Sequence, residues 1–251
     1  MKILVLQLAR FGDILTTWPV LRALKRAHPH ASIDILVRHR FREACEGNSA
    51  IDRVWALDSD HLMEPLLTEA PSVEESLARL EAFLRPMTGE GYHTVLNLSF
   101  SPASAFLTRV FERHGAEARG YSRHEDGSLK LADAYSEYFY AQVGIGKPNR
   151  VHLADLLAGV AQTELTRDDW RAVTFDSIVP RIAVHIGASQ EQKSYSPDRW
   201  AVALQEILKW WPHGITLIGS GGEQPRADRI CELLDNARVV NAVGKTKFSE
   251  L

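Results

Sequence analysis

Residues 2–24 read KILVLQLARFGDILTTWPVLRAL, and this stretch determines the fold of the chain. Residues 3–8 form an apolar run with the length of a buried β-strand. Arg10, Phe11 and Gly12 interrupt the run, and we expect Gly12 to give the backbone its freedom for a sharp turn. The apolar residues between positions 14 and 24 recur with helical spacing, so Asp13 occupies the expected N-cap of a helix.

Asp13 therefore follows the first strand of a parallel α/β sheet. Open sheets of this kind bind their ligands at the carboxyl ends of the strands. Aspartate is also a preferred helix cap. The residue types alone leave two interpretations of Asp13 open, a structural cap and a general base.

The composition is that of a globular protein with a substantial core. The chain has 251 residues, of which 45% are hydrophobic and 24% are charged. The net charge of −3 makes a general nucleic-acid binder a poor fit. Cys45 and Cys231 are far apart in sequence and suit a reducing compartment. The apolar run at residues 3–9 is too short to span a bilayer, and we expect a cytoplasmic protein.

Strand and helix patterns alternate along the whole chain, which predicts an α/β fold with two doubly wound parallel sheets. Strands are expected first at residues 3–8, 33–37, 53–57 and 94–98, and later at residues 182–186, 215–218 and 239–240. The sequence changes character over residues 171–180. We place the domains at residues 1–175 and 176–251.

Two loops of the second domain contain groups that could bind an anion. Gly187 and Ser189 follow a predicted strand and offer small residues with approachable backbone amides, and Lys193 lies further along the same loop. A diphosphate would find amides, a hydroxyl and an ammonium group there, although a solvent-exposed loop lysine fits the pattern as well. Glu223 follows the next strand at the start of a helix, where a carboxylate favours the helix dipole.

The first domain is locally basic and contains one acidic pair. Arg38 and Arg40 follow the second strand, and Arg119 and Arg123 belong to a later one. These arginines suit either a solvated face or attraction to an anionic ligand or lipid surface. Residues 58–60 form a D-x-D triplet, a pattern that can hold a divalent metal ion and a diphosphate; we interpret it as a loop.

The opening stretch resembles a known enzyme family. Residues 10–25, R-F-G-D-I-L-T-T-x-P-x-L-R-A-L-K, look like the start of family 9 glycosyltransferases, the lipopolysaccharide heptosyltransferase family. The resemblance continues over residues 32–54 and resumes at residues 185–200 and 217–251. The family's D-T-G-x-x-H segment is absent, so the resemblance implies a C-terminally truncated chain.

This resemblance implies a GT-B fold, with two Rossmann-like domains of which the second is incomplete. It implies that Asp13 is the catalytic base and that Lys193, with Gly187 and Ser189, binds the donor diphosphate. Glu223 would contact the donor ribose, an interpretation that we weigh evenly against a role at the helix dipole. Residues on the acceptor side would be Gly12, Arg38, Arg40, Arg119 and Arg123.

The implied activity is inverting transfer of a sugar, such as heptose from ADP-heptose, to a lipopolysaccharide core-type acceptor without a metal or other cofactor. The expected partners are a nucleotide-sugar donor and an anionic lipid-linked saccharide, with peripheral contact to the inner membrane face and no nucleic acid. Two alternatives stay open: a non-catalytic nucleotide-binding relative, and a GT-B-type sugar-nucleotide epimerase.

Overall fold

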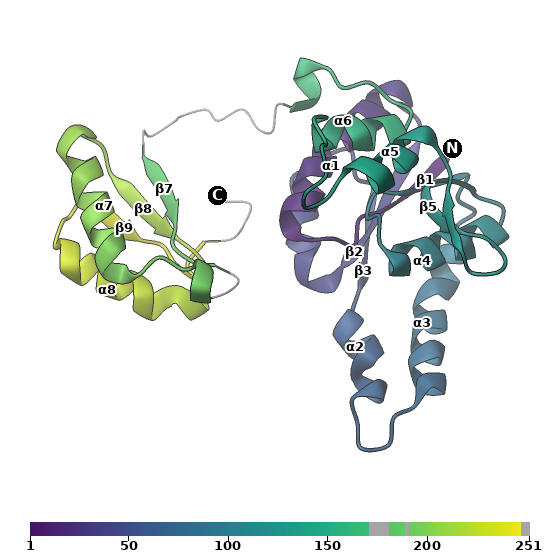
Figure 1. Ribbon diagram of the computed structural model, residues 1–251, viewed down its shortest axis with the longest axis horizontal. Coiled ribbons are helices and arrows are strands. Elements are labelled where there is room, and N and C mark those ends of the chain that lie inside the picture. Colours follow the sequence, from purple (N-terminus) through teal and green to yellow (C-terminus); the bar gives the residue numbers. More distant parts are fainter. Residues whose placement is uncertain (171–180, 189–190, 247–251) are drawn as a thin grey trace. The chain divides into compact units, whose positions relative to one another are not determined.

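A computed structural model describes residues 1–170, 181–188 and 191–246 (Figure 1). The chain divides into two compact units, residues 1–172 and 173–251. Each unit contains a parallel sheet with helices packed on it, so the predicted α/β fold class is confirmed. The predicted domain boundary, between residues 175 and 176, lies outside the described residues.

The sheet of the first unit has the strand order β3-β2-β1-β4-β5-β6. Its first five strands are parallel, and β6 pairs with β5 in the antiparallel sense. The strands are β1 (Lys2–Leu6), β2 (Ser32–Arg38), β3 (Arg53–Leu57), β4 (Thr94–Asn97), β5 (Glu117–Arg123) and β6 (Leu129–Leu131). Because the chain reaches β2 and β3 on one side of β1 and β4 on the other, the sheet has a topological switch point between β1 and β4.

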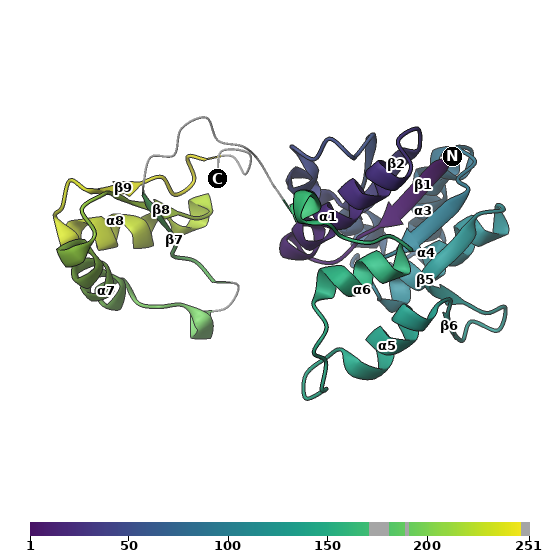
Figure 2. The same ribbon diagram turned by 90° about the horizontal axis from the view of Figure 1, so that it is seen from above.

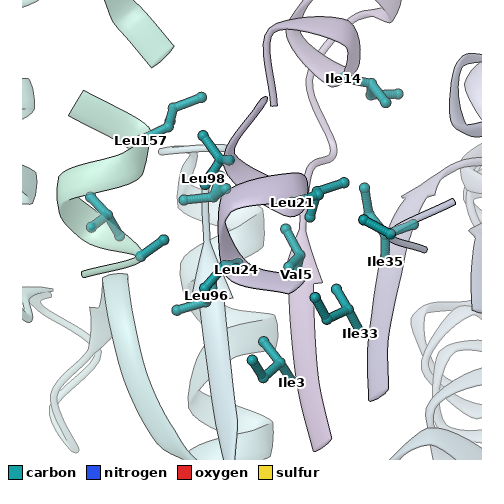
Figure 3. Close-up of a cluster of buried hydrophobic side chains, with 14 of the residues drawn as sticks. Ile3, Val5, Ile14, Leu21, Leu24, Ile33, Ile35, Leu96, Leu98 and Leu157 are labelled. Carbon is teal, nitrogen blue, oxygen red and sulfur yellow. The ribbon is translucent and has the colours of Figure 1, made fainter. Parts of the chain in front are cut away.

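Helices cover both faces of this sheet because successive strand residues point to opposite sides. The helical elements are α1 (Phe11–Ala27), η1 (His39–Cys45), α2 (Ser59–Met63), η2 (Glu64–Leu66), α3 (Val73–Thr88), α4 (Pro102–Arg113), α5 (Ala134–Gln142), α6 (Leu153–Val160) and η3 (Arg167–Trp170). On one face, Ile3 and Val5 pack with residues of α1 and α6 (Figure 3). On the other face, Leu4 and Leu6 pack with residues of α3 and α4. Helices α5 and α6 lie side by side (Figure 2).

The start of α1 differs from the expectation in two respects. The N-cap is Arg10, and Asp13 is the third residue of the helix, where its Oδ2 accepts a hydrogen bond of 2.9 Å from the Arg10 N–H. Asp13 therefore caps the helix by reaching back to the turn. Gly12 lies within the helix, and its φ is not in the left-handed region, so the sharp turn does not depend on a glycine there.

The second unit has a three-stranded parallel sheet in the order β7-β8-β9, counted over the described residues. Its elements are β7 (Ile182–His185), η4 (Glu191–Lys193), α7 (Pro197–Trp210), β8 (Ile215–Ile218), η5 (Gly221–Glu223), α8 (Gln224–Leu234) and β9 (Val239–Asn241). Leu204 of α7 and Ile230 of α8 pack against Ile215 and Leu217 of β8. The strand–helix alternation predicted here is therefore present.

Candidate functional site

The switch point of the first sheet brings together the segments that follow β1 and β4. The N–H of Leu8 donates to Ser99 Oγ at 2.6 Å, and the Ser99 hydroxyl donates to the carbonyl of Leu6 at 3.1 Å. These bonds fix the turn that precedes α1 against the turn that precedes α4. Asp13 is thereby positioned at the carboxyl edge of β1, where open α/β sheets bind ligands.

A pocket of about 470 Å³ opens beside Asp13. Its polar walls come from several elements: Arg10 and Asp13 from the start of α1, Arg38 from β2, and Ser99 from the segment after β4. The Asp13 side chain is half-buried, and one carboxylate oxygen is held by the Arg10 N–H. The carboxylate thus lies between a turn that holds it and an open pocket from which a ligand could reach it.

Arg38 and Arg10 give this pocket its positive charge, and Arg38 is the more buried of the two. Its guanidinium donates to the carbonyl of Ala9 at 2.8 Å and lies over the ring of Phe41. Burial, followed by the charges of Arg40 and Arg10, lowers the pKa of Arg38, and Asp13 opposes that shift. The Nε of Arg38 is buried and has no hydrogen-bond partner within the described part of the chain. The pocket thus offers a cationic group beside a carboxylate.

The other predicted acceptor-side residues are spread over the first unit. Gly12 is exposed at the start of α1, and Arg40 is exposed with its guanidinium over Phe41. Arg119 pairs with Glu117 at 3.0 Å, and Arg123 donates to the carbonyl of Gly127 at 3.1 Å. Within the described structure, neither Arg119 nor Arg123 lines the Asp13 pocket, because β5 directs both to local partners.

The D-x-D triplet has a structural explanation. Asp58 is the N-cap of α2 and accepts hydrogen bonds from the backbone N–H groups of Asp60 and His61 at 3.2 and 3.1 Å. The bond from His61 is the largest of several causes that lower the pKa of Asp58. Our interpretation of this triplet as a loop was incomplete, because its first aspartate begins a short helix.

In the second unit, Gly187 and Glu223 lie together at the carboxyl ends of β7 and β8. A Cβ added at Gly187 would come within 1.4 Å of Glu223 Oε1, and one at Gly219 within 2.4 Å of Oε2. Only glycine allows the carboxylate to approach both backbones. Glu223 Oε2 also accepts a hydrogen bond of 2.7 Å from the Ser220 N–H, so Glu223 caps the start of η5.

Glu223 also lines a pocket of about 330 Å³ with Ala188, Ser194 and Arg226. Lys193 is the exposed last residue of η4. Ser194, the residue after Lys193, lines this pocket, whereas Lys193 is not among the described residues that line it. Ser189, predicted to bind phosphate, lies outside the described residues.

Several lining residues were not found from the sequence. Ser59, Ser99 and Ser101 line the Asp13 pocket, and Ser194 and Arg226 line the pocket in the second unit. The rule that open α/β sheets bind ligands at their switch point would have identified the segment after β4, because β4 neighbours β1. Ser194 and Arg226 are ordinary loop and helix residues, and no signal in the sequence distinguishes them.

The comparisons with known proteins agree with this architecture. No family model matches the chain. The chain is 22% identical over 258 residues to Lipopolysaccharide heptosyltransferase 1 of Campylobacter coli. The alignment covers 93% of this chain and 69% of that relative. The structure of E. coli heptosyltransferase WaaC with ADP matches 99% of the chain and 77% of its own length, with 18% identity and a TM-score of 0.68.

A glycosyltransferase of family 9 from Veillonella parvula matches with a TM-score of 0.66 and 17% identity over 98% of this chain and 70% of its own. The fold and these relatives define the class, a glycosyltransferase with the GT-B fold. Within that class the resemblance predicted from the sequence is confirmed: the chain is similar to the heptosyltransferases of family 9.

Over the described residues, no helix has the length and apolar content needed to cross a bilayer.

Proposed function

We propose that the protein is an inverting, metal-independent glycosyltransferase that transfers a heptose from ADP-heptose to a lipopolysaccharide core-type acceptor. The observation that carries the proposal is the Asp13 carboxylate, held at the carboxyl edge of β1 beside a cationic pocket. The names of the relatives support the donor: one of the matched structures is described as WaaC with ADP-2-deoxy-2-fluoro heptose.

In the proposed reaction, the acceptor hydroxyl attacks the anomeric carbon from the face opposite the diphosphate. A C–O bond to the acceptor forms, the C–O bond to the diphosphate breaks, and ADP leaves. Asp13 takes the hydroxyl proton as the attack proceeds. The Arg10 N–H holds one oxygen of the Asp13 carboxylate in place at the start of α1. The carboxylate needs to take the proton only as the attack proceeds, because the hydroxyl becomes acidic in the transition state.

The two pockets would serve the two substrates. Arg38 and Arg10, which both line the Asp13 pocket, would attract the anionic acceptor. Gly187, Ser189 and Lys193 would hold the donor diphosphate and stabilise the charge that develops on it as it leaves. The carboxylate of Glu223 would contact the donor ribose from the pocket that it lines. We also propose peripheral contact with the inner membrane face, because the acceptor is lipid-linked.

The test is a transfer assay with ADP-heptose and a heptose-free lipopolysaccharide core, in the presence of a chelator. Mass spectrometry should show addition of one heptose, and NMR should show the inverted anomeric configuration. Donor binding without any product would favour a non-catalytic nucleotide-binding relative. Transfer that stops on chelation and returns with a divalent cation would contradict metal independence.

A further inference from the structure

The chain between α5 and α6 exposes apolar side chains to solvent. Figure 2 shows it as a loop that extends away from the sheet of the first unit. We define the α5–α6 loop as residues 140–151, which includes the last residues of α5. Ile145 has a relative exposure of 107%, Tyr140 of 57% and Val151 of 38%. Neighbouring apolar side chains that stay in water mark a surface that contacts another molecule.

Two contacts give this loop a defined shape. At its base, the Tyr138 hydroxyl donates to Asn149 Oδ1 at 3.1 Å. Nearer the tip, the Lys147 ammonium donates to the carbonyl of Tyr140 and lies over the Tyr140 ring, 5.7 Å from its centroid. The second contact brings both ends of the turn together and leaves Ile145 between them. The loop therefore presents an aliphatic side chain, an aromatic ring and an ammonium group on one short turn.

The charge of the loop indicates what it contacts. Lys147 and Arg150 are exposed, and residues 138–154 contain no aspartate or glutamate, although the whole chain has a net charge of −3. Glu137 and Asp155 border this segment on either side. An exposed aliphatic group, a tyrosine ring and nearby cations are the combination that binds the interface of an anionic bilayer.

A second exposed apolar residue of the first unit shows why exposure alone is not sufficient. Leu67 follows η2 and is 80% exposed. Its neighbours Glu64 and Glu69 are exposed as well, so its surroundings are acidic. An anionic headgroup layer would repel these carboxylates, whereas it would attract the cations of the α5–α6 loop.

The α5–α6 loop is attached at both ends to the Asp13 site. A small cavity beside Asp13 is lined by Phe139 of α5 and by Leu153 of α6, the residues that flank the loop and its last neighbour His152. An acceptor anchored in a bilayer reaches Asp13 most readily when the site lies close to that bilayer. A lipid contact made by this loop would hold the Asp13 site near the membrane surface.

We propose that the α5–α6 loop is a membrane-contact site for an anionic bilayer. Ile145 and Tyr140 enter the interface, and Lys147 and Arg150 pair with lipid phosphate groups. Apolar insertion and charge together give reversible binding that neither gives alone. The inference rests on the proposed function for its purpose, because a lipid-linked acceptor explains why the contact adjoins Asp13. The contact with lipid itself requires neither donor nor acceptor.

The test is sedimentation of the full chain with lipid vesicles in the absence of donor and acceptor. Vesicles of equal parts phosphatidylglycerol and phosphatidylcholine present an anionic surface, and vesicles of phosphatidylcholine alone present a neutral one. We expect about tenfold tighter binding to the anionic vesicles, because two cations face them. Equal binding to both compositions, or no binding to the anionic vesicles, would overturn the proposal.

Variants of the apolar residues locate the contact. Ile145→Ser should weaken binding to the anionic vesicles about tenfold, because an aliphatic side chain no longer enters the interface. The melting temperature should not change, since Ile145 is fully exposed. Leu67→Ser is the matched control, because it removes an exposed leucine from acidic surroundings, and it should leave binding unchanged. Equal effects of the two variants would overturn the proposal.

The double variant Lys147→Gln and Arg150→Gln tests the charge. It should abolish the preference for anionic over neutral vesicles, and a preference that survives would place the lipid contact elsewhere. Sedimentation velocity of the wild type and of Ile145→Ser tests the other occupant of this surface, a second copy of the chain. A dimer that dissociates in Ile145→Ser, without any vesicle binding by the wild type, would overturn the proposal.

Transfer assays separate this inference from the proposed function. With the acceptor embedded in anionic vesicles, Ile145→Ser should raise KM, whereas turnover of a water-soluble, lipid-free core saccharide should be unchanged. An unchanged KM for the embedded acceptor would overturn the link between the loop and the Asp13 site. Failure of the proposed function would appear differently, as absence of product from the wild type with both acceptors while vesicle binding persists.

Discussion

Asp13 in the first unit and Glu223 in the second occupy the same local position in their sheets. Each lies at the helix start that follows a parallel strand, and each accepts a hydrogen bond from the backbone N–H three residues earlier. For Asp13 that donor is Arg10 at 2.9 Å, and for Glu223 it is Ser220 at 2.7 Å. By local geometry alone, the two carboxylates have the same capping role.

Their surroundings separate them. The Asp13 carboxylate adjoins a pocket of about 470 Å³ that it shares with Arg38. The Glu223 carboxylate also lines a pocket, of about 330 Å³, but it lies in addition against the backbones of Gly187 and Gly219, where side chains would collide with it. Two acids with the same capping role therefore have different neighbours, and the residues brought in from neighbouring strands determine how tightly each carboxylate is confined.

The largest expected effect is the loss of transfer in Asp13→Asn. The amide oxygen can still accept from the Arg10 N–H, so the helix keeps its cap, but the base is gone. We expect turnover to fall by about 10²–10⁴-fold, with the melting temperature and donor affinity almost unchanged. Turnover, thermal unfolding and donor titration check this. Retention of most of the turnover would reduce Asp13 to a cap like Glu223.

Lys193→Ala should weaken donor binding by about 1.5–3 kcal/mol, the contribution of a hydrogen bond to a charged group. Calorimetric titration with ADP in the presence of a chelator measures it. Lys209→Ala, which removes an exposed lysine from the same unit, is the control and should leave the affinity unchanged. Equal effects of the two variants would show that Lys193 contributes only general charge.

Gly187→Ala tests the close contact in the second unit. Its Cβ would force Glu223 away from the strand end, so we expect a destabilisation of about 1–3 kcal/mol, typical of overpacking. Denaturant unfolding, followed by a probe in the second unit, measures the effect. If the variant is as stable as the wild type, the Glu223 carboxylate has an alternative position, and its contact with Gly187 does not constrain it.

Gly12→Ala should have the smallest effect and the opposite sign. Gly12 is helical, and an added Cβ there meets nothing within 4 Å. Alanine should therefore stabilise the first unit by about 0.5–1 kcal/mol. The same unfolding experiment applies, with a probe in the first unit. A destabilised variant would indicate that the turn before α1 does require a glycine, as the sequence pattern suggested.

The sequence by itself determined the elements and their class. Apolar runs marked β1 and β8, helical periodicity marked α1 and α7, and their alternation implied parallel sheets. These features are local, because the spacing of apolar residues within one strand or helix indicates which side of it is buried. The stretch at residues 10–25 added the resemblance to family 9, which the comparisons confirm.

The tertiary structure alone decided which side chains meet. Local spacing could not show that Asp13 reaches back to Arg10, because a cap depends on the path of the preceding turn. Local spacing also could not show that Arg38 lies near Asp13, whereas Arg119 pairs with Glu117. Which residues meet depends on the strand order and on the course of the loops. A periodic pattern records burial within one element, and a site forms where the ends of different elements converge.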